Sequence, residues 1–245
     1  MSDSTEQLHP KDRRNLERTL AELRNMHGQA LGSVVLYGEA ASSGYRPKGS
    51  PLTLAVVVEE LTPTILRRMQ PRIGAWRRRR IPTPLVMDQL YIESSLDVFP
   101  LEFLDITDEH LLLHGDDPFC QLQFNKEHLR LEVEQQMRGK MLHLWENYLE
   151  AGRSKRTLRS LLLATPPGFE VILRGMLFLT DQRRPDGPTA ILAATESTFG
   201  LELPVFLRLE EVRRGKAKLA RGSLEDTFET YLEEVRSLVR VADGL

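Results

Sequence analysis

Residues 34–58, VVLYGEAASSGYRPKGSPLTLAVVV, contain the strand–loop–strand unit on which the rest of the fold is built. The β-branched and large apolar residues over 33–37 stop at Gly38, which predicts a short buried strand followed by a turn. The loop after it is rich in glycine, serine and proline, the residues that turns require. Residues 52–58 are then almost continuously apolar, which is typical of a strand covered on both faces.

Helices are expected on either side of this unit. Leucines recur every three or four positions over residues 10–29, which predicts an amphipathic helix. After the second strand, Thr62 offers a capping side chain and Pro63 suits the first helical position. The helix that begins there is expected to carry its arginines up to Pro71 or beyond.

The middle of the chain predicts further strands. Apolar residues alternate over 96–106, which indicates a third strand, and Pro100 places it at a sheet edge or a bulge. Residues 110–114 are a candidate fourth strand before a turn. Residues 85–91 fit either a helix or a strand.

The character of the chain changes after residue 120. Helical periodicity follows, with expected helices over 126–151, 156–163, 169–179, 189–198 and from 224 onward after Ser223. The predicted fold class is α+β: a mixed-sheet domain over residues 1–120 and a C-terminal helical bundle over residues 121–245.

Composition excludes several classes of protein. Lys and Arg total 33 against 35 Asp and Glu, and this balance argues against a globally basic nucleic-acid binder. Cys120 is the single cysteine, so no intrachain disulfide can form and a reducing compartment is expected. The polar N-terminus and the short apolar runs predict a cytoplasmic protein without a membrane partner.

The segment 34–58 resembles the active-site hairpin of the polymerase-β-like nucleotidyltransferase superfamily. Members have a strand, Gly-Ser, a short helix that ends in Gly and often Tyr-Arg-Pro, then Ser-Asp-hydrophobic-Asp on the next strand. This chain has GYRP at 44–47 and SPLT at 50–53. Residues 96–106, followed by HGDDP at 114–118, are also similar to bacterial members. The resemblance implies a nucleotidyltransferase-like fold and a nucleotide cleft formed by Gly38, Glu39, Ser43 and Arg46.

The resemblance also implies where metal ligands should lie. Nucleotidyl transfer needs Mg²⁺ to bridge phosphate oxygens, and two carboxylates two residues apart on one strand face suit this ion. Family members place these two Asp where this chain has Pro51 and Thr53. Proline has no side-chain oxygen and threonine has only a neutral hydroxyl, so we expect no metal site and no cofactor.

Glu39 stands where the family has the serine that holds the distal phosphates. A carboxylate about 4 Å from a phosphate oxygen repels it by about 4 kcal/mol per unit charge at an effective dielectric near 20. The usual arginine two residues further is Ala41 here. We interpret Glu39 as a cap of the short helix beginning near Ala40, where negative charge is favourable. The alternative is a relocated metal ligand that acts with Asp97 or Glu102, the candidate acids of the expected third strand.

Three functions follow from these residues. The leading one is a degenerate, inactive nucleotidyltransferase that serves as a binding or interaction module, with a protein partner or as a homodimer through the helical half. The alternative is a divergent enzyme that transfers NMP from an NTP with a rebuilt Mg²⁺ site.

The third function is nucleic-acid binding through the run Arg77, Arg78, Arg79 and Arg80, next to Trp76. Against it, positive charge is ordinary at a helix C-terminus, and four consecutive residues fan around a helix instead of forming one face.

Overall fold

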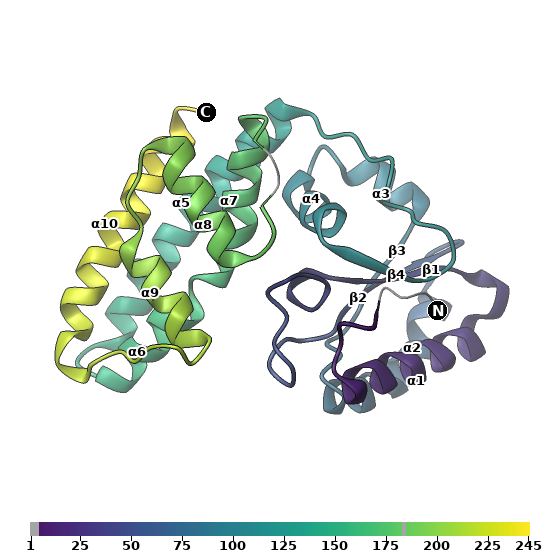
Figure 1. Ribbon diagram of the computed structural model, residues 1–245. Helices are drawn as coiled ribbons and strands as arrows, with labels where there is room; N and C mark the ends of the chain where they lie inside the picture. Colours follow the sequence, from purple (N-terminus) through teal and green to yellow (C-terminus); the bar gives the residue numbers. More distant parts are fainter. Residues whose placement is uncertain (1–4, 183–184) are drawn as a thin grey trace. The chain divides into compact units, whose positions relative to one another are not determined.

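The computed structural model describes residues 5–182 and 185–245, which form two compact units (Figure 1). The first unit comprises the described residues of Met1–Val98 and Glu102–Phe124, and the second comprises Phe99–Leu101 and those of Asn125–Leu245. Each unit has its own core, and each is described by itself.

The first unit is a mixed four-stranded sheet with helices on both faces. Its elements are α1 (Pro10–His27), η2 (Gly28–Ala30), β1 (Leu31–Tyr37), η3 (Gly38–Ala41), β2 (Thr53–Val58), α2 (Pro63–Arg78), β3 (Leu85–Asp88), α3 (Gln89–Ser95), α4 (Pro100–Asp108) and β4 (His110–His114), and the first two residues of α4 belong to the second unit. The strand order is β3-β2-β1-β4. β1 is antiparallel to β2 and β4, and β2 is parallel to β3.

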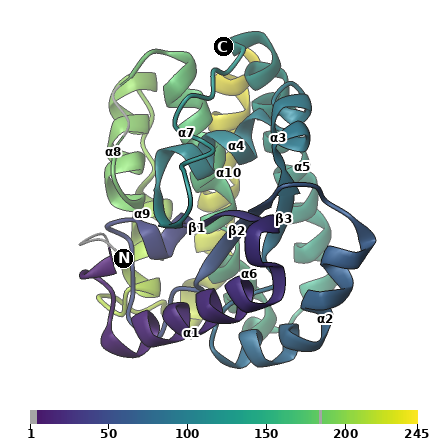
Figure 2. The same ribbon diagram turned by 90° about the vertical axis from the view of Figure 1, so that its right-hand side faces the viewer.

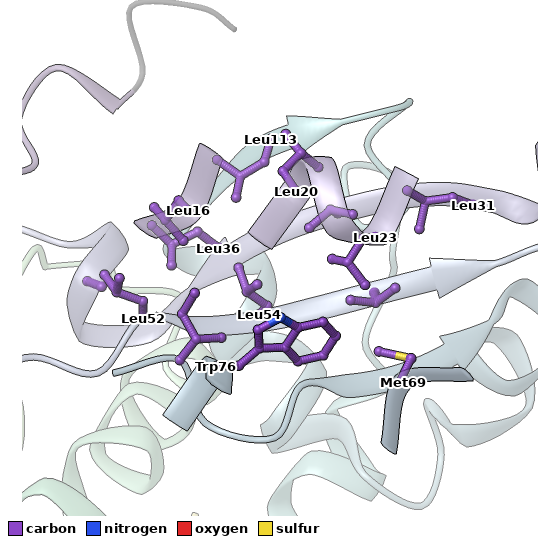
Figure 3. Packing of buried hydrophobic residues seen from close by; sticks show 14 of the residues in the cluster. Leu16, Leu20, Leu23, Leu31, Leu36, Leu52, Leu54, Met69, Trp76 and Leu113 are labelled. Atoms are coloured by element: carbon purple, nitrogen blue, oxygen red, sulfur yellow. The ribbon is translucent and has the colours of Figure 1, made fainter. Parts of the chain in front are cut away.

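Both faces of the central strands are buried, which confirms the interpretation of their continuous apolar runs. On one face, α1 and α2 lie side by side and pack leucines and Trp76 against alternate residues of β1 and β2 (Figures 2 and 3). On the other face, Val35, Ala55 and Val57 pack against α3 and α4. The two helices predicted around the hairpin are therefore confirmed, and Thr62 accepts the N–H of Ile65 as the cap of α2.

The predicted strand over 96–106 is wrong, because α4 occupies most of this segment. Pro100 is its first residue, where the missing N–H has no helical partner to lose. The N–H of Leu101 donates to the buried Glu132 carboxylate at 2.8 Å, so a residue far along the chain supports this helix start. Phe103 and Ile106 are three positions apart and share one buried face, a spacing that the apparent alternation concealed.

The third strand is β3, from the segment whose sequence fitted both helix and strand. It ends at Asp88, which caps α3 by accepting the N–H of Tyr91 at 2.8 Å. The predicted short strand at 110–114 is confirmed as β4.

The second unit is entirely helical in its described residues. It contains α5 (Lys126–Ala151), α6 (Lys155–Ala164), α7 (Pro167–Leu179), α8 (Pro188–Phe199), α9 (Pro204–Arg213), η4 (Arg221–Ser223) and α10 (Leu224–Asp243). Phe169, Phe206 and Tyr231 make aromatic contacts in its core, with ring centroids 4.8–6.4 Å apart. The helical bundle was predicted from the sequence, except for α9.

One stretch of the described chain, Lys155–Leu179, is long and apolar enough by composition to cross a membrane. It is divided here between α6 and α7, and 50% of its most apolar part is buried. Leu162, Phe169 and Leu173 are among its core residues. Packing inside the helical unit is a sufficient reason for this composition.

Candidate functional site

The candidate site lies at the end of the two central strands, where β1 ends and β2 begins. Tyr37 and Thr53 are paired across the two strands. Gly38 follows at φ 71°, in the left-handed region that favours glycine, and its N–H donates to the Glu109 carbonyl at 3.2 Å. The chain can therefore turn sharply out of the strand and into the loop that the resemblance marked as a nucleotide cleft.

Two of the predicted cleft residues form an ion pair with each other. Arg46 donates from Nε to Oε1 of Glu39 at 2.9 Å and from Nη2 to Oε2 at 3.2 Å. Such a two-pronged guanidinium–carboxylate contact is among the stronger hydrogen-bonded pairs in proteins. The interpretation of Glu39 as a helix cap is wrong, because Glu39 lies in the first turn of η3 and the N-cap of this helix is Tyr37.

The rest of the loop is held by its own polar side chains. Ser42 Oγ accepts the N–H of Gly44 at 2.9 Å, and Ser50 Oγ accepts the N–H of Arg46 at 2.9 Å. Ser43, the remaining predicted cleft residue, is exposed. The loop is thus a closed structure in which Glu39 and Arg46 are already neutralised.

The loop is also fastened to α1. The Tyr45 hydroxyl donates to Asp12 Oδ2 at 2.6 Å and accepts the N–H of His9 at 3.1 Å. Burial and the bond to Asp12 raise the pKa of the Tyr45 hydroxyl above its usual range. Asp12 is 1% exposed, so its charge is satisfied inside the structure and is not presented to a ligand.

Pro51 and Thr53 occupy the positions that the resemblance gives to metal ligands. Pro51 is exposed and Thr53 half-buried, while Leu52 between them is fully buried in the core under α1 and α2. Alternate residues of a strand share a face, so Pro51 and Thr53 lie on the face opposite to Leu52. That face offers one neutral hydroxyl at this point and no carboxylate from either residue.

The other candidate acids lie on different elements from those expected. Asp97 is exposed in the turn between α3 and α4, and Glu102 is exposed in the first turn of α4. Both were predicted on a strand, and this prediction is wrong. Across residues 5–182 and 185–245, no group of three His, Cys, Asp or Glu side chains is placed to hold a metal ion.

The acid that does lie on the third strand is at the far end of the sheet. Asp88 pairs with Val58, five residues along β2 from Thr53, a separation of about 16 Å at about 3.3 Å per residue. Its carboxylate accepts the N–H groups of Leu61 and Tyr91, and these bonds hold the pKa of Asp88 below its usual range. Asp88 is therefore a structural cap.

A cavity of about 740 Å³ lies near Asp88, at the end of the sheet far from the candidate site. Four of its lining residues are acidic: Glu59, Glu93, Asp116 and Asp117. Asp117 is engaged, because its Oδ2 is 2.9 Å from His110 Nε2 and its Oδ1 accepts the N–H of Phe119 at 2.9 Å. None of the described residues that line this cavity belongs to the loop between β1 and β2.

The arginine run divides into two anchored and two exposed residues. Arg79 donates to Glu22 at 2.8 Å, and Arg80 donates to Asp12 at 3.1 Å. Both contacts tie the end of α2 to α1. Arg77 and Arg78 are exposed in the last turn of α2. The four side chains therefore do not form one continuous basic face.

Two of these arginines lie beside Pro51, one of the two positions that the resemblance gives to metal ligands. A cavity of about 560 Å³ is lined by Gly49, Pro51, Arg77, Arg80, Pro82 and Thr83. The sequence placed the arginine run and the hairpin in two separate hypotheses. The structure brings them together, and among the described residues no acidic side chain lines this cavity.

The arrangement of elements can be compared with solved structures. By sequence, the chain matches no protein-family model and none of the curated proteins. By structure, it is similar to spectinomycin adenyltransferase AAD(9) from Enterococcus faecialis, a polymerase-β-like nucleotidyltransferase solved with ATP and spectinomycin. The TM-score is 0.54 at 12% identity, over 91% of this chain and 99% of that chain.

The chain has the nucleotidyltransferase fold. The predicted α+β class, with a mixed sheet followed by C-terminal helices, is confirmed. At 12% identity the likeness concerns the fold, so the roles of residues in this nucleotidyltransferase-fold protein rest on its own geometry. Two features of that geometry were missed from the sequence: the Glu39–Arg46 pair and the arginine-lined cavity beside Pro51.

Proposed function

We propose that this protein uses the nucleotidyltransferase fold as a non-catalytic binding module. One observation carries the proposal: the two positions to which the resemblance gives carboxylates hold Pro51 and Thr53, and the cavity that Pro51 lines is also lined by Arg77 and Arg80. A divalent cation beside Pro51 would meet the positive charge of these arginines where it needs anionic oxygen ligands. Without the cation, the charge that develops on the transferred phosphoryl group has no metal to offset it.

The rebuilt metal site is less well supported by the same geometry. Its three candidate ligands were Glu39, Asp97 and Glu102. Glu39 is engaged by Arg46 at 2.9 Å, and the two other acids lie on a turn and on α4. Moving Glu39 onto a metal would require breaking a two-pronged ion pair and leaving Arg46 without its carboxylate.

A transfer assay tests the proposal directly. The protein is incubated with Mg²⁺, each labelled nucleoside triphosphate and an acceptor, and pyrophosphate release reports transfer to any acceptor. Spectinomycin is one acceptor to include, because the structural neighbour AAD(9) is named for it. We expect release no faster than in matched reactions with EDTA.

A second result of the same assay would contradict the proposal. Mg²⁺-dependent release that is lost in Glu39→Gln or Asp97→Asn, and kept in a control such as Glu233→Gln on α10, would establish the enzyme instead. Glu233 is a suitable control because its side chain is 63% exposed and belongs to the helical unit.

A further inference from the structure

The cavity beside Pro51 is lined by two arginines and by residues with small side chains. Gly49, Pro51 and Pro82 supply three of its six lining residues. Its volume of about 560 Å³ lies inside the range of about 300–1,000 Å³ that is typical of small-molecule sites. The cavity is therefore large enough for a ligand bigger than a single water-sized ion.

Arg80 is fixed in place at the edge of this cavity. It has φ 65°, a left-handed conformation that is strained for a residue other than glycine. Its carbonyl accepts the N–H of Leu52 at 2.9 Å, and its Nη2 donates to the Ser50 carbonyl at 2.7 Å and to Asp12 at 3.1 Å. The strained backbone and these three bonds hold the guanidinium against the start of β2.

Arg80 has donor capacity beyond these contacts. Both of its side-chain bonds to Asp12 and Ser50 use Nη2 alone. Its Nη1 makes no hydrogen bond to a described residue and is the donor open to a ligand, whereas its Nε, also without a partner among these residues, is buried. Since a guanidinium carries five N–H donors, the group is not saturated by its protein acceptors.

Arg77 supplies a second and more exposed guanidinium. Its Nη2 donates to Thr83 Oγ1 at 3.2 Å, across the cavity lining. The helix end beneath it presents few free acceptors, because the carbonyls of Trp76 and Arg77 accept the N–H groups of Arg79, Arg80 and Ile81 at 2.8–3.0 Å. The negative pole of α2 is thus partly covered by its own turn.

We propose that this cavity binds a small phosphate-bearing anion, of the phosphomonoester or diphosphate class, without a metal ion. Paired guanidinium forks match phosphate oxygens, and arginine is suited to this two-pronged recognition. Asp12 pairs with Arg80, whereas among the described residues Arg77 has no salt bridge and no acidic side chain lines the cavity, so Arg77 adds positive charge there. The inference rests on the proposed function, since it gives a ligand class to a fold that binds without divalent metal.

The test measures binding of pyrophosphate by titration calorimetry in EDTA, with the full chain. Wild type should bind saturably, and Arg77→Gln should weaken binding by about ten- to a hundredfold, the effect of losing a hydrogen bond from a charged donor. The matched control is Arg78→Gln. Arg78 is the next arginine of the same helix end, is exposed, and does not line the cavity. We expect this control to change affinity less than about threefold, through long-range charge alone.

Parallel titrations identify the source of the phosphate. Inorganic phosphate, AMP and ADP are compared with pyrophosphate, and tighter binding of the nucleotides would assign the ligand as a nucleotide, whereas equal binding would assign free phosphate or diphosphate. Absence of saturable binding for all four probes overturns the inference, and so does equal loss in Arg77→Gln and Arg78→Gln. Because EDTA is present throughout, failure of anion binding is measured separately from the Mg²⁺-dependent transfer assay, so a failure of this inference can be told apart from a failure of the proposed function.

Discussion

Glu234 provides a prediction whose magnitude can be worked out from the structure. This carboxylate on α10 is 5% exposed and accepts the N–H groups of Val205 and Phe206 at 2.8 and 3.0 Å, at the start of α9. Burial raises the pKa of Glu234 from its ordinary value of 4.5 to about 7. Between these two values the folded chain keeps a proton that the unfolded chain releases.

The sign of the effect follows from this difference. The folded state binds more protons than the unfolded state between pH 4.5 and about 7, so the free energy of unfolding falls as pH rises through that window. At about 1.4 kcal/mol per pH unit, the total loss is up to about 3 kcal/mol. Glu234→Gln removes the titrating group. The substitution should abolish this slope, at the cost of a pH-independent loss of about 1 kcal/mol because the amide nitrogen cannot accept an N–H.

The assay is urea unfolding followed by far-ultraviolet circular dichroism, at several pH values across this window. Glu233→Gln is the control, since Glu233 is adjacent in sequence and its side chain is 63% exposed. The reasoning is refuted if Glu234→Gln keeps the wild-type slope, or if Glu233→Gln loses it equally.

Four further predictions follow, of which three concern the first unit and one concerns the second. Burial holds the pKa of His27 below its usual range, so protonation of the unfolded chain should lower stability as pH falls through about 6.5. His27→Leu should remove this loss in acid titrations of stability, and an unchanged profile would contradict it. Asp12→Asn should lower the free energy of unfolding by about 2 kcal/mol in urea, because it leaves Arg80 without its buried carboxylate. A decrease below about 0.5 kcal/mol would contradict a stabilising role for the Asp12–Arg80 ion pair. Gly115→Ala should destabilise by about 3 kcal/mol or more, since its Cβ would lie 2.0 Å from a backbone oxygen at φ 75°. By contrast, Gly139→Ala in the interior of α5 should stabilise by about 0.5–1 kcal/mol, and equal melting temperatures for the two glycine variants would refute this account of the turn.

Elements with local signals could be predicted from the sequence. The hairpin strands are short apolar runs, and α2 begins with a capping Thr62 followed by Pro63. The long helix α5 was expected over 126–151, and the structure gives it these bounds. In each case the residues that decide the element lie within it or next to it.

Elements supported from elsewhere in the chain could not be predicted in this way. The N-terminus of α4 uses Glu132 of α5, and that of α9 uses Glu234 of α10. Neither partner can be identified from spacing alone. The 96–106 segment also carries apolar residues that fit period two and helical spacing at once, and only the buried face of α4 decides between them.

The candidate site was predicted in part. Pro51 and Thr53 were singled out because the resemblance assigns carboxylates to their positions. The cavity was not predicted, because Arg77 and Arg80 are distant in sequence from Pro51. Arg80 is held there by its left-handed conformation and its bond to the Ser50 carbonyl, and Arg77 bonds to Thr83 of the same lining. A sequence pattern does not report either feature.

A titration of the protein with Mn²⁺ alone tests the central claim most directly, since Mn²⁺ accepts the same hard oxygen ligands as Mg²⁺ and broadens nearby amide signals. If the start of β2 has lost its ability to hold a divalent ion, the amide resonances of Tyr37 and Thr53 should keep their linewidths relative to the rest of the sheet. Selective, saturable broadening of these two signals at sub-millimolar Mn²⁺ would contradict the account.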